Sequence, residues 1–289
     1  MPVRLLHMSD IHFGYENASA IEAAADYAAA TPFDLLAVSG DITQYGKFNE
    51  FRSAAAWLAS IPGPHLSTPG NHDTPWLGLF ERMVMPFARY ARTIGPPREA
   101  SFEAPGLSVR AINSARGWQV RLNWSKGEIS RKQAESASRR LEAAAPGAVR
   151  VLVCHHPLVE VQDAPMTARV RGGRFAAKRF AQANIDAVLT GHLHAPFVQV
   201  LPFDDERTYA IGASTLSLRE RGATPGFNVI EIDGDQMAVN AMAWDGRILN
   251  VQRAWVVPLR PRGLRARPRA DTTAEPHRRT SEATGAGAT

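Results

Sequence analysis

The sequence has one cysteine, Cys154, and no long apolar run. A single thiol excludes an internal disulfide, and no stretch approaches the ~20 apolar residues that a membrane helix requires. The N-terminus, MPVRLLHMSD, becomes polar too early for a secretory signal. We therefore expect no membrane association, and we expect a cytoplasmic protein, because that is the default compartment for a chain without disulfides.

Residues 1–257 also carry little net charge, because most of the positive charge of the chain lies in its C-terminal segment. The formal charge of the 289 residues is +5. Residues 258–289 contain seven arginines against three acidic residues, a net +4, which leaves about +1 for residues 1–257. Residues 1–257 therefore offer no long basic track for a nucleic-acid backbone. We expect them to form one domain, and we expect residues 258–289 to be a basic, disordered tail.

The chain does contain an alternation of short apolar runs and helical patterns, which is typical of an α/β protein. The expected strands are 3–10, 33–41, 149–157 and 185–192, and the expected helices are 17–30, 48–60, 130–145 and 175–183. Asn17 or Ser19 is placed to cap the first helix. From about 198 to 257 the pattern alternates as in β-hairpins, with turn signals at 233–235 and 245–246.

Polar residues stand where the apolar runs end. The motifs are D-I-H at 10–12, G-D at 40–41, G-N-H-D at 70–73, H-H-P at 155–157 and G-H-L-H at 191–194. In α/β sheets ligands bind at this edge, because loops there bring side chains from several strands together. Each motif alone has an ordinary explanation as a turn or a hydrogen-bonded histidine. Their joint occurrence favours a metal site.

This series of motifs resembles the signature of the calcineurin-like metallophosphoesterase superfamily. The segments LLHMSDIHFG, SGDITQYGKFNEF, KGEISRKQAESASRRL and ATPGFNVIEID further resemble the branch that contains class III cyclic nucleotide phosphodiesterases. The resemblance implies a four-layer αββα sandwich, in which two mixed β-sheets are flanked by helices. It also implies a dinuclear metal site at the C-terminal ends of the strands.

The residue types agree with such a site. Carboxylate, imidazole and amide groups suit two divalent ions such as Mn, Fe, Zn or Co. Ions ~3.5–4 Å apart can hold a bridging hydroxide and clamp a phosphoryl group. By the resemblance, the ligands of the first ion would be Asp10, His12, Asp41 and His194. Those of the second would be Asp41, Asn71, His155 and His192, with Asp41 bridging both ions.

We expect catalytic roles for the two residues that follow Asn71, for His72 from the resemblance and for Asp73 from its proximity to His72. His72 would point toward the substrate, where it assists the leaving oxygen or stabilises transition-state charge. Asp73 would hydrogen-bond to that imidazole and orient it, by analogy with other histidine–carboxylate pairs. His156 follows a predicted ligand on the same strand, so we expect it to pack or to support the site rather than to bind metal.

The expected activity is hydrolysis of a small phosphodiester such as a cyclic nucleotide. A phosphomonoesterase or a nuclease could use the same site, and a scaffold that has lost catalysis is a further alternative. The loops nearest the motifs offer Lys47 as their only cation, which favours a diester over a dianionic monoester. A base or aryl group could stack on Tyr15, Phe13 or Trp76. The expected partner is a small phosphoester, and nucleic acid is not expected.

Overall fold

Two six-stranded sheets form the centre of the molecule. The computed structural model describes residues 2–120, 123–162, 164, 166, 170–261 and 263. The first sheet has the order β12-β11-β10-β1-β2-β3 and the second the order β4-β5-β6-β7-β9-β8. The strands of the first sheet are β1 (Val3–Met8), β2 (Leu35–Val38), β3 (His65–Ser67), β10 (Gly226–Asp233), β11 (Gln236–Trp244) and β12 (Leu249–Pro258). Those of the second are β4 (Ala100–Ala104), β5 (Leu107–Ala111), β6 (Val149–Val153), β7 (Ala187–Thr190), β8 (Phe197–Val200) and β9 (Tyr209–Gly212).

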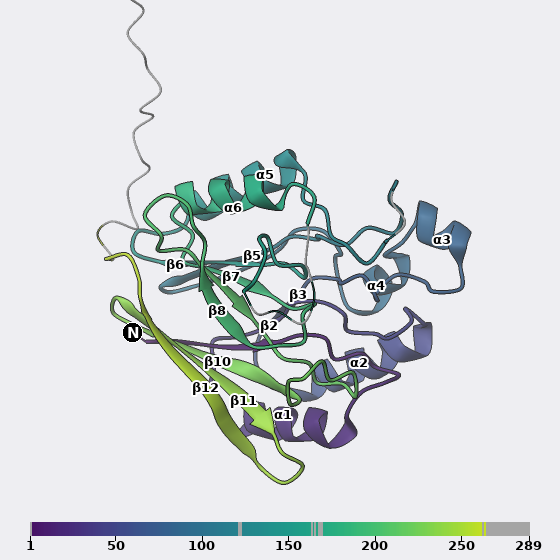
Figure 1. Ribbon diagram of the computed structural model, residues 1–289. Helices are drawn as coiled ribbons and strands as arrows, with labels where there is room; N and C mark the ends of the chain where they lie inside the picture. Colours follow the sequence, from purple (N-terminus) through teal and green to yellow (C-terminus); the bar gives the residue numbers. More distant parts are fainter. Residues whose placement is uncertain are drawn as a thin grey trace, which may run out of the picture.

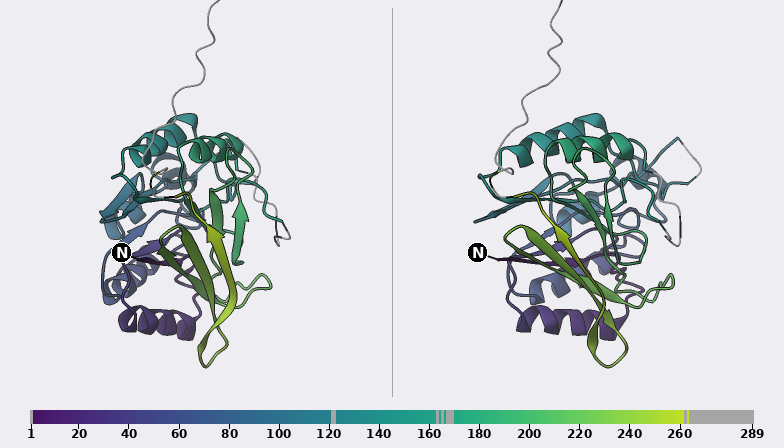
Figure 2. Two further views of the ribbon diagram at one scale, coloured as in Figure 1. Left: turned by 90° about the vertical axis from the view of Figure 1, so that its left-hand side faces the viewer. Right: turned by 60° about the vertical axis from the view of Figure 1, so that its left-hand side comes forward.

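Helices cover the outer face of each sheet (Figures 1 and 2). The helices are α1 (Ala18–Ala30), α2 (Phe48–Ser60), α3 (Leu79–Val84), α4 (Ala88–Thr93), α5 (Arg131–Glu142) and α6 (Gly173–Gln182). α1 and α2 pack on the first sheet, and α5 and α6 pack on the second. Asn17 caps α1, because its side chain accepts a hydrogen bond from the Ala20 amide at 3.1 Å. The predicted αββα sandwich is confirmed.

The alternation of side chains along each strand builds three apolar layers. In β1, Leu5 points into the core between the two sheets, whereas Leu6 points outward to α1 and α2. In β6, Val151 lies in the same central core and Leu152 faces α5 and α6. Strands that are buried on both faces read as continuous apolar runs, which is why these segments were recognisable in the sequence.

Both sheets contain parallel strands whose C-terminal ends carry the loops of interest. β1, β2 and β3 are parallel to one another. β5, β6, β7 and β9 are also parallel to one another. β9 therefore differs from the hairpin arrangement expected after residue 198, since it pairs in parallel with β7 and forms a hairpin with β8 alone. This difference positions a further loop beside the motifs.

The folded body extends slightly beyond residue 257. β12 ends at Pro258, and Leu259 and Arg260 are buried. The expected tail from 262 onward, apart from Gly263, lies outside the described residues. Within the described part of the chain, no helix combines the length and apolar character needed to cross a bilayer.

Candidate metal centre

The loops that follow β1, β2, β6 and β7 are joined to one another by backbone and side-chain hydrogen bonds. The Asp10 amide donates to the Gly40 carbonyl at 3.0 Å, which joins the first two loops. The His192 amide donates to Asp10 Oδ2 at 2.9 Å and links the loop after β7 to the one after β1. The His155 ring reaches Ser39 O at 2.8 Å. These bonds connect the two sheets at the edge where the polar motifs stand.

The backbone is strained at the predicted ligands. Five of them have φ between 50° and 68°, in the left-handed region that side chains with a Cβ rarely adopt. These are Asp10, His12, Asp41, His192 and His194. Such residues cost on the order of 1–3 kcal/mol each and cluster at functional sites. A Cβ on Gly70 would collide with Asp41 Oδ1, so this glycine is required by the close approach of two site loops.

One group of donors gathers around Asp10. The Asp10 Oδ1 atom lies 3.1 Å from His194 Nε2 and 3.8 Å from His12 Nε2. The two imidazole nitrogens are 3.4 Å apart. All three residues are buried, and their facing atoms lie within 4.8 Å of one another. The geometry is that of a small cage in which one cation can take three of its ligands.

A second group lies on the other side of Asp41. The Asp41 Oδ2 atom is 3.2 Å from His155 Nε2 and 4.0 Å from His12 Nε2, so this carboxylate faces both groups. The ring centroids of His155 and His192 are 5.2 Å apart. Asn71 is buried close by. The amide of the next residue, His72, donates a hydrogen bond to Asp41 Oδ1 at 2.8 Å. The structure thus brings the seven predicted ligands to one edge of the sandwich.

The unpaired atoms of this centre fit divalent cations. Asp10 Oδ1, Asn71 Oδ1 and His155 Nε2 are buried and make no hydrogen bond to any residue that the structure describes. Such atoms are costly in a protein interior unless something binds them. The other ring nitrogens of His155 and His194 contact the backbone carbonyls of Ser39 and Arg219 at 2.8 and 2.7 Å. A carbonyl can only accept, so each Nδ1 carries a proton, and Nε2 is the atom of each ring that faces the centre and is able to bind a cation.

The electrostatics favour ionised carboxylates beside mostly neutral imidazoles. Burial and the neighbouring His155 lower the pKa of His192 to about 3, and burial lowers the pKa of His12 well below its usual value. Burial acts to raise the pKa of Asp10, but the neighbouring His194 and His155 hold it below its ordinary range. His155 is the exception: despite its burial, the Asp41 carboxylate raises its pKa to about 9. A cation must therefore displace a proton from His155.

His72 stands at the open side of the centre, partly exposed. Its ring centroid is 4.8 Å from that of His12, with the two planes nearly perpendicular. Nδ1 contacts the backbone carbonyl of Gln44 at 2.8 Å, and Nε2 lies 2.9 Å from Nη1 of Arg219. The structure therefore brings His72 to the centre without adding it to the buried ligands.

The predicted role of Asp73 is wrong. Its carboxylate accepts hydrogen bonds from the Gly70 amide at 2.8 Å, the Thr43 amide and hydroxyl at 2.8 Å, and the Ile42 amide at 3.2 Å. The carbonyl of Gln44 orients the His72 ring instead. A carboxylate beside four donors has no free position for an imidazole. Asp73 holds the loops after β2 and β3 together and acts on the site through their backbone.

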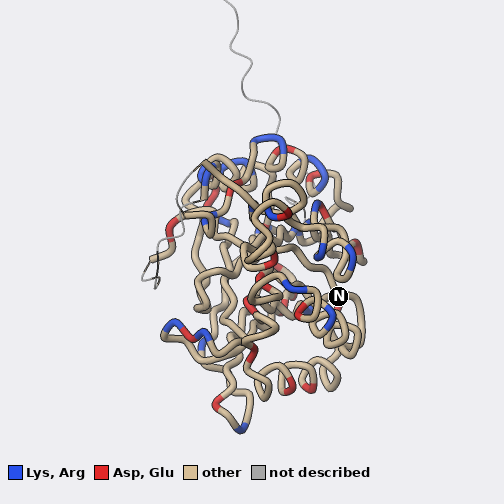
Figure 3. The backbone as a smooth tube through the Cα atoms, turned by 90° about the vertical axis from the view of Figure 1, so that its right-hand side faces the viewer, with Lys and Arg blue, Asp and Glu red and all other residues tan. Residues whose placement is uncertain are grey.

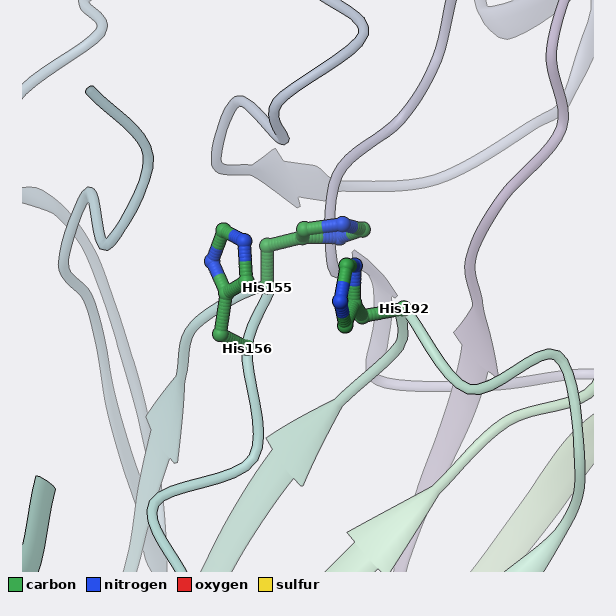
Figure 4. A group of neighbouring side chains, drawn as sticks. All are labelled: His155, His156 and His192. Atoms are coloured by element: carbon green, nitrogen blue, oxygen red, sulfur yellow. The ribbon is translucent and has the colours of Figure 1, made fainter. Parts of the chain in front are cut away.

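His156 completes the histidine group drawn in Figure 4, where it follows β6 beside His155 and lies near His192. Its ring centroid is 4.6 Å from that of His192. However, Nδ1 bonds to Ser114 Oγ and Nε2 to the Ser125 carbonyl, both at 2.8 Å. Both ring nitrogens are thus occupied, which agrees with a supporting role. His156 thereby ties Ser114 and Ser125 to the metal centre.

An aromatic cleft of about 280 Å³ opens beside His72 and Asn71. Tyr45, Trp76 and Trp124 line it. Trp76 was expected near the substrate and is 60% exposed. The expectation that Phe13 offers a stacking surface is wrong, because Phe13 is buried. Its ring centroid lies 5.9 Å from that of Trp57.

The sequence did not point to Trp124, Arg219 or Arg221. Arg219 and Arg221 lie in the loop after β9 and approach His72 and His192, so Lys47 is not the sole cation near the site. The usable signal was that the apolar run of β9 ends in a polar loop, as the other site strands do. Assigning β9 to a hairpin region hid this signal. No signal in the sequence pointed to Trp124, because it lies far from the end of any strand along the chain.

Comparisons with known proteins agree with this architecture. The family model for calcineurin-like phosphoesterases matches residues 3–196. A protein of Synechococcus sp. named probable cyclic nucleotide phosphodiesterase is 26% identical over 169 residues, covering 57% of this chain and 60% of that protein. A purple acid phosphatase from yellow lupin (Lupinus luteus) superposes with a TM-score of 0.61 at 12% identity, covering 89% of this chain and 54% of that one. GAP50 of Plasmodium, described as the anchor in the inner membrane complex, gives a TM-score of 0.56 at 12% identity, covering 90% and 89%.

These comparisons carry different weight. The structural likenesses, at 12% identity, show the fold alone. The chain spans 60% of the length of its curated relative and 54% of the lupin protein. The family match covers more than half of the chain and includes every polar motif of the metal centre, from residue 10 to residue 194. The chain belongs to the calcineurin-like phosphoesterase family.

Proposed function

We propose that the protein is a metal-dependent phosphoester hydrolase that acts on small phosphodiesters, with cyclic nucleotides as the favoured class. The observation that carries this proposal is the set of buried, unpaired donor atoms on Asp10, Asn71 and His155, which meet beside a partly exposed histidine. Divalent cations bound there would supply Lewis-acid activation of a phosphoryl group. The Synechococcus relative, named as a probable cyclic nucleotide phosphodiesterase, supports the same substrate class.

The chain's own residues provide orientation and proton handling. Asp10 and Asp41 contribute negative charge, and the backbone carbonyls at Ser39 and Arg219 fix the ligand tautomers of His155 and His194. His72 has Nδ1 held by Gln44, so its Nε2 is the atom that can exchange a proton or hydrogen bond with the substrate. The imidazole is the group suited to assist departure of the alcohol.

The aromatic cleft supports a substrate with a planar group. Tyr45 and Trp76 lie 6.1 Å apart, centroid to centroid, in an edge-to-face arrangement beside His72. A base or aryl ring attached to the phosphoryl group would find stacking surfaces there. Basic and acidic residues are interspersed along the chain (Figure 3), which favours a small substrate over a nucleic-acid backbone.

Phosphomonoester hydrolysis is a second candidate, and Arg219 is the observation that favours it. A dianionic monoester has an additional charged oxygen, and the guanidinium of Arg219 stands at His72, on the open side of the centre. The further alternative is a scaffold without catalysis. It is disfavoured because every expected ligand position holds a metal-binding residue type and because His72 is present. A nuclease is disfavoured by the dispersed charge.

A substrate panel tests the proposal. Bis(p-nitrophenyl) phosphate, p-nitrophenyl phosphate and the 2′,3′- and 3′,5′-cyclic nucleotides would be assayed with Mn, Fe, Co or Zn supplied in turn. We expect a higher kcat/KM for the diester than for the monoester, and turnover of at least one cyclic nucleotide. A tenfold preference for the monoester would select the second candidate. Failure to hydrolyse any of these esters with any metal would contradict the assignment as a hydrolase.

A further inference from the structure

Arg219 has a backbone that is fixed to the metal centre. Its carbonyl oxygen accepts from His194 Nδ1 at 2.7 Å, and its amide donates to Ser217 Oγ at 3.2 Å. The same loop is tied to the first strand, since Thr215 Oγ1 donates to the Asp10 carbonyl at 2.6 Å. The position of residue 219 is therefore set by the ligands themselves, while its long side chain extends to His72.

The contact between Arg219 and His72 defines the proton positions. A guanidinium has five N–H donors and no acceptor, so Nε2 of His72 must accept from Nη1 of Arg219 across 2.9 Å. Nδ1 then carries the ring proton and donates to the Gln44 carbonyl. In this arrangement the nitrogen that faces the open side of the site is occupied by the guanidinium of Arg219.

The guanidinium of Arg219 differs from other arginines of the fold in its charged neighbours. Several other arginines of the fold are paired, such as Arg89 with Glu81, Arg179 with Glu142 and Arg260 with Asp205. Among the residues that the structure describes, no carboxylate lies within 4.0 Å of Arg219, whose side chain is partly exposed. An unpaired arginine at the mouth of a phosphoesterase centre is a ready receptor for an anion.

The neighbouring Arg221 differs in its contacts. Its Nη1 donates to the His192 carbonyl at 3.1 Å and also contacts the sulfur of Met166. Arg221 thus supports the backbone of a predicted ligand. Arg219 instead bonds to a side chain that can release it, because a charged N–H binds an anionic oxygen more strongly than it binds a neutral imidazole.

We propose that Arg219 is a substrate-binding residue that takes a phosphoryl oxygen and in doing so releases Nε2 of His72 for the reaction. This inference rests on the proposed phosphoester hydrolase function. Without substrate, the guanidinium holds His72 in one tautomer. When a phosphoryl group enters, the guanidinium transfers its hydrogen bond from the imidazole to the anionic oxygen, and the released Nε2 can take up a proton from solvent water and donate it to the ester oxygen. Arg219 and His72 then contact different oxygens of the same phosphoryl group.

Binding of inorganic phosphate to the full-length, Mn²⁺-loaded protein tests this role by calorimetry. The variants are Arg219→Gln, Arg219→Lys and the control Lys178→Gln, which removes one positive charge from the exposed face of α6. Metal content is measured for each. We expect Arg219→Gln to raise the Kd for phosphate by about 10- to 100-fold, the usual worth of a hydrogen bond to a charged group. Lys should restore part of the affinity, and the control should match the wild type.

A second pair of proteins separates direct contact from an effect through His72. If Arg219 touches phosphate, Arg219→Gln weakens binding in a His72→Ala background as well. If the arginine only positions the imidazole, that loss disappears in the double variant, and the inference is overturned. An unchanged Kd in Arg219→Gln at full metal content overturns it too.

The same proteins keep this inference distinct from the proposed function. A wild-type protein that hydrolyses bis(p-nitrophenyl) phosphate, with phosphate binding indifferent to Arg219, removes the role of Arg219 and leaves the hydrolase. A protein that binds phosphate through Arg219 yet cleaves no ester supports the anion site and contradicts the hydrolase. Phosphate that fails to bind the wild type overturns the role of Arg219, whatever the ester assays give.

Discussion

The Oδ2 atom of Asp41 lies 3.2 Å from Nε2 of His155, so residues that follow strands of different sheets meet in the middle of the metal centre. The contact is buried, and the Asp41 carboxylate raises the pKa of His155 to about 9, so without metal this pair shares a proton. A divalent cation that takes both atoms as ligands replaces that proton. Asp41 also faces His12, which makes it the ligand shared by both groups.

Replacing Asp41 with Asn should therefore lower the content of both metals. The amide keeps an oxygen for the hydrogen bond from the His72 amide but loses the charge and one acceptor. We expect metal affinity to fall by more than the about 10- to 100-fold typical of residues that only orient ligands, and activity to be abolished. Elemental analysis checks the result, with Asp26→Asn on the exposed face of α1 as control. Two metals per chain in the variant would refute the shared-ligand assignment.

Replacing His72 with Ala should separate catalysis from metal binding. No predicted ligand changes, so metal content should stay near that of the wild type. We expect kcat to fall by about 10²–10⁴, the usual contribution of a positioned acid–base group, and to fall less for esters with good leaving groups. His65→Ala, at an exposed position on β3, is the matched control. A large loss of metal in the His72 variant would place this residue among the ligands.

Most of the centre was predictable because its ligands are adjacent in sequence to buried strands. β1, β2, β6 and β7 are short apolar runs that can be recognised in the sequence. Parallel strands end at a common edge, so the residues that follow these runs are expected to lie close together. That rule does not distinguish a metal ligand from a residue whose side chain accepts hydrogen bonds from backbone amides. The role of Asp73 was therefore mistaken: the donors that satisfy it come from Gly70 and the loop after β2, and this depends on tertiary folding.

Contacts made by the backbone or by distant loops left no sequence signal. The carbonyl of Gln44 orients His72, and a carbonyl is present at every position. Trp124 reaches the cleft because His156 holds the Ser125 carbonyl, a contact between residues 31 positions apart. Arg219 required the pairing of β9 with β7 to be known. These features follow from the fold and not from a local pattern.

The aromatic cleft predicts a selective effect on substrates with planar groups. Trp76→Ala should raise KM for a cyclic nucleotide by about 5- to 100-fold, since stacking of a base on an aromatic side chain is worth about 1–3 kcal/mol. The Kd for inorganic phosphate, which has no ring, should not change. Trp118→Ala is the control, because Trp118 is 47% exposed but does not line the cleft. Equal effects of the two substitutions would argue against a base-binding cleft.

Acid should destabilise the fold partly through His7. This residue is buried, with Nε2 2.9 Å from Ser39 Oγ, and burial lowers its pKa from 6.5 to about 3. The unfolded chain binds a proton below pH 6.5 while the folded chain does not, so this contribution is present above pH 6.5 and is lost as the pH falls toward 3. The loss is about 1.4 kcal/mol per pH unit.

Urea unfolding at pH 7, 6, 5 and 4 checks this contribution, with EDTA keeping all proteins metal-free. His7→Gln should be less stable than the wild type at pH 7, and the difference should shrink as the pH falls. The control is His65→Gln, at an exposed position, which should follow the wild-type curve. A constant difference between His7→Gln and the wild type across this range would show that His7 does not contribute to the acid sensitivity.

The C-terminal limit of the domain gives the last prediction. Leu259 is 1% exposed and its amide donates to the Asp235 carbonyl at 2.7 Å. Arg260 pairs with Asp205 at 2.6 Å and donates to the Ile185 carbonyl at 3.1 Å. A chain that ends after Pro261 keeps all of these contacts, and the composition of residues 262–289 offers little apolar surface for packing. We expect its Tm and turnover of a small ester to match those of the full chain.

A chain that ends after Val257 should behave differently. It loses the burial of one leucine, worth about 1.5–3 kcal/mol, and leaves Asp205 without its arginine. For a domain of this size each kcal/mol corresponds to about 2–4 °C, so Tm should fall by about 5 °C or more. Calorimetry of the two truncated proteins beside the full chain distinguishes the cases. Equal Tm values for both truncations would show that Leu259 and Arg260 contribute nothing, and a drop already after Pro261 would show that the arginine-rich segment binds the folded body.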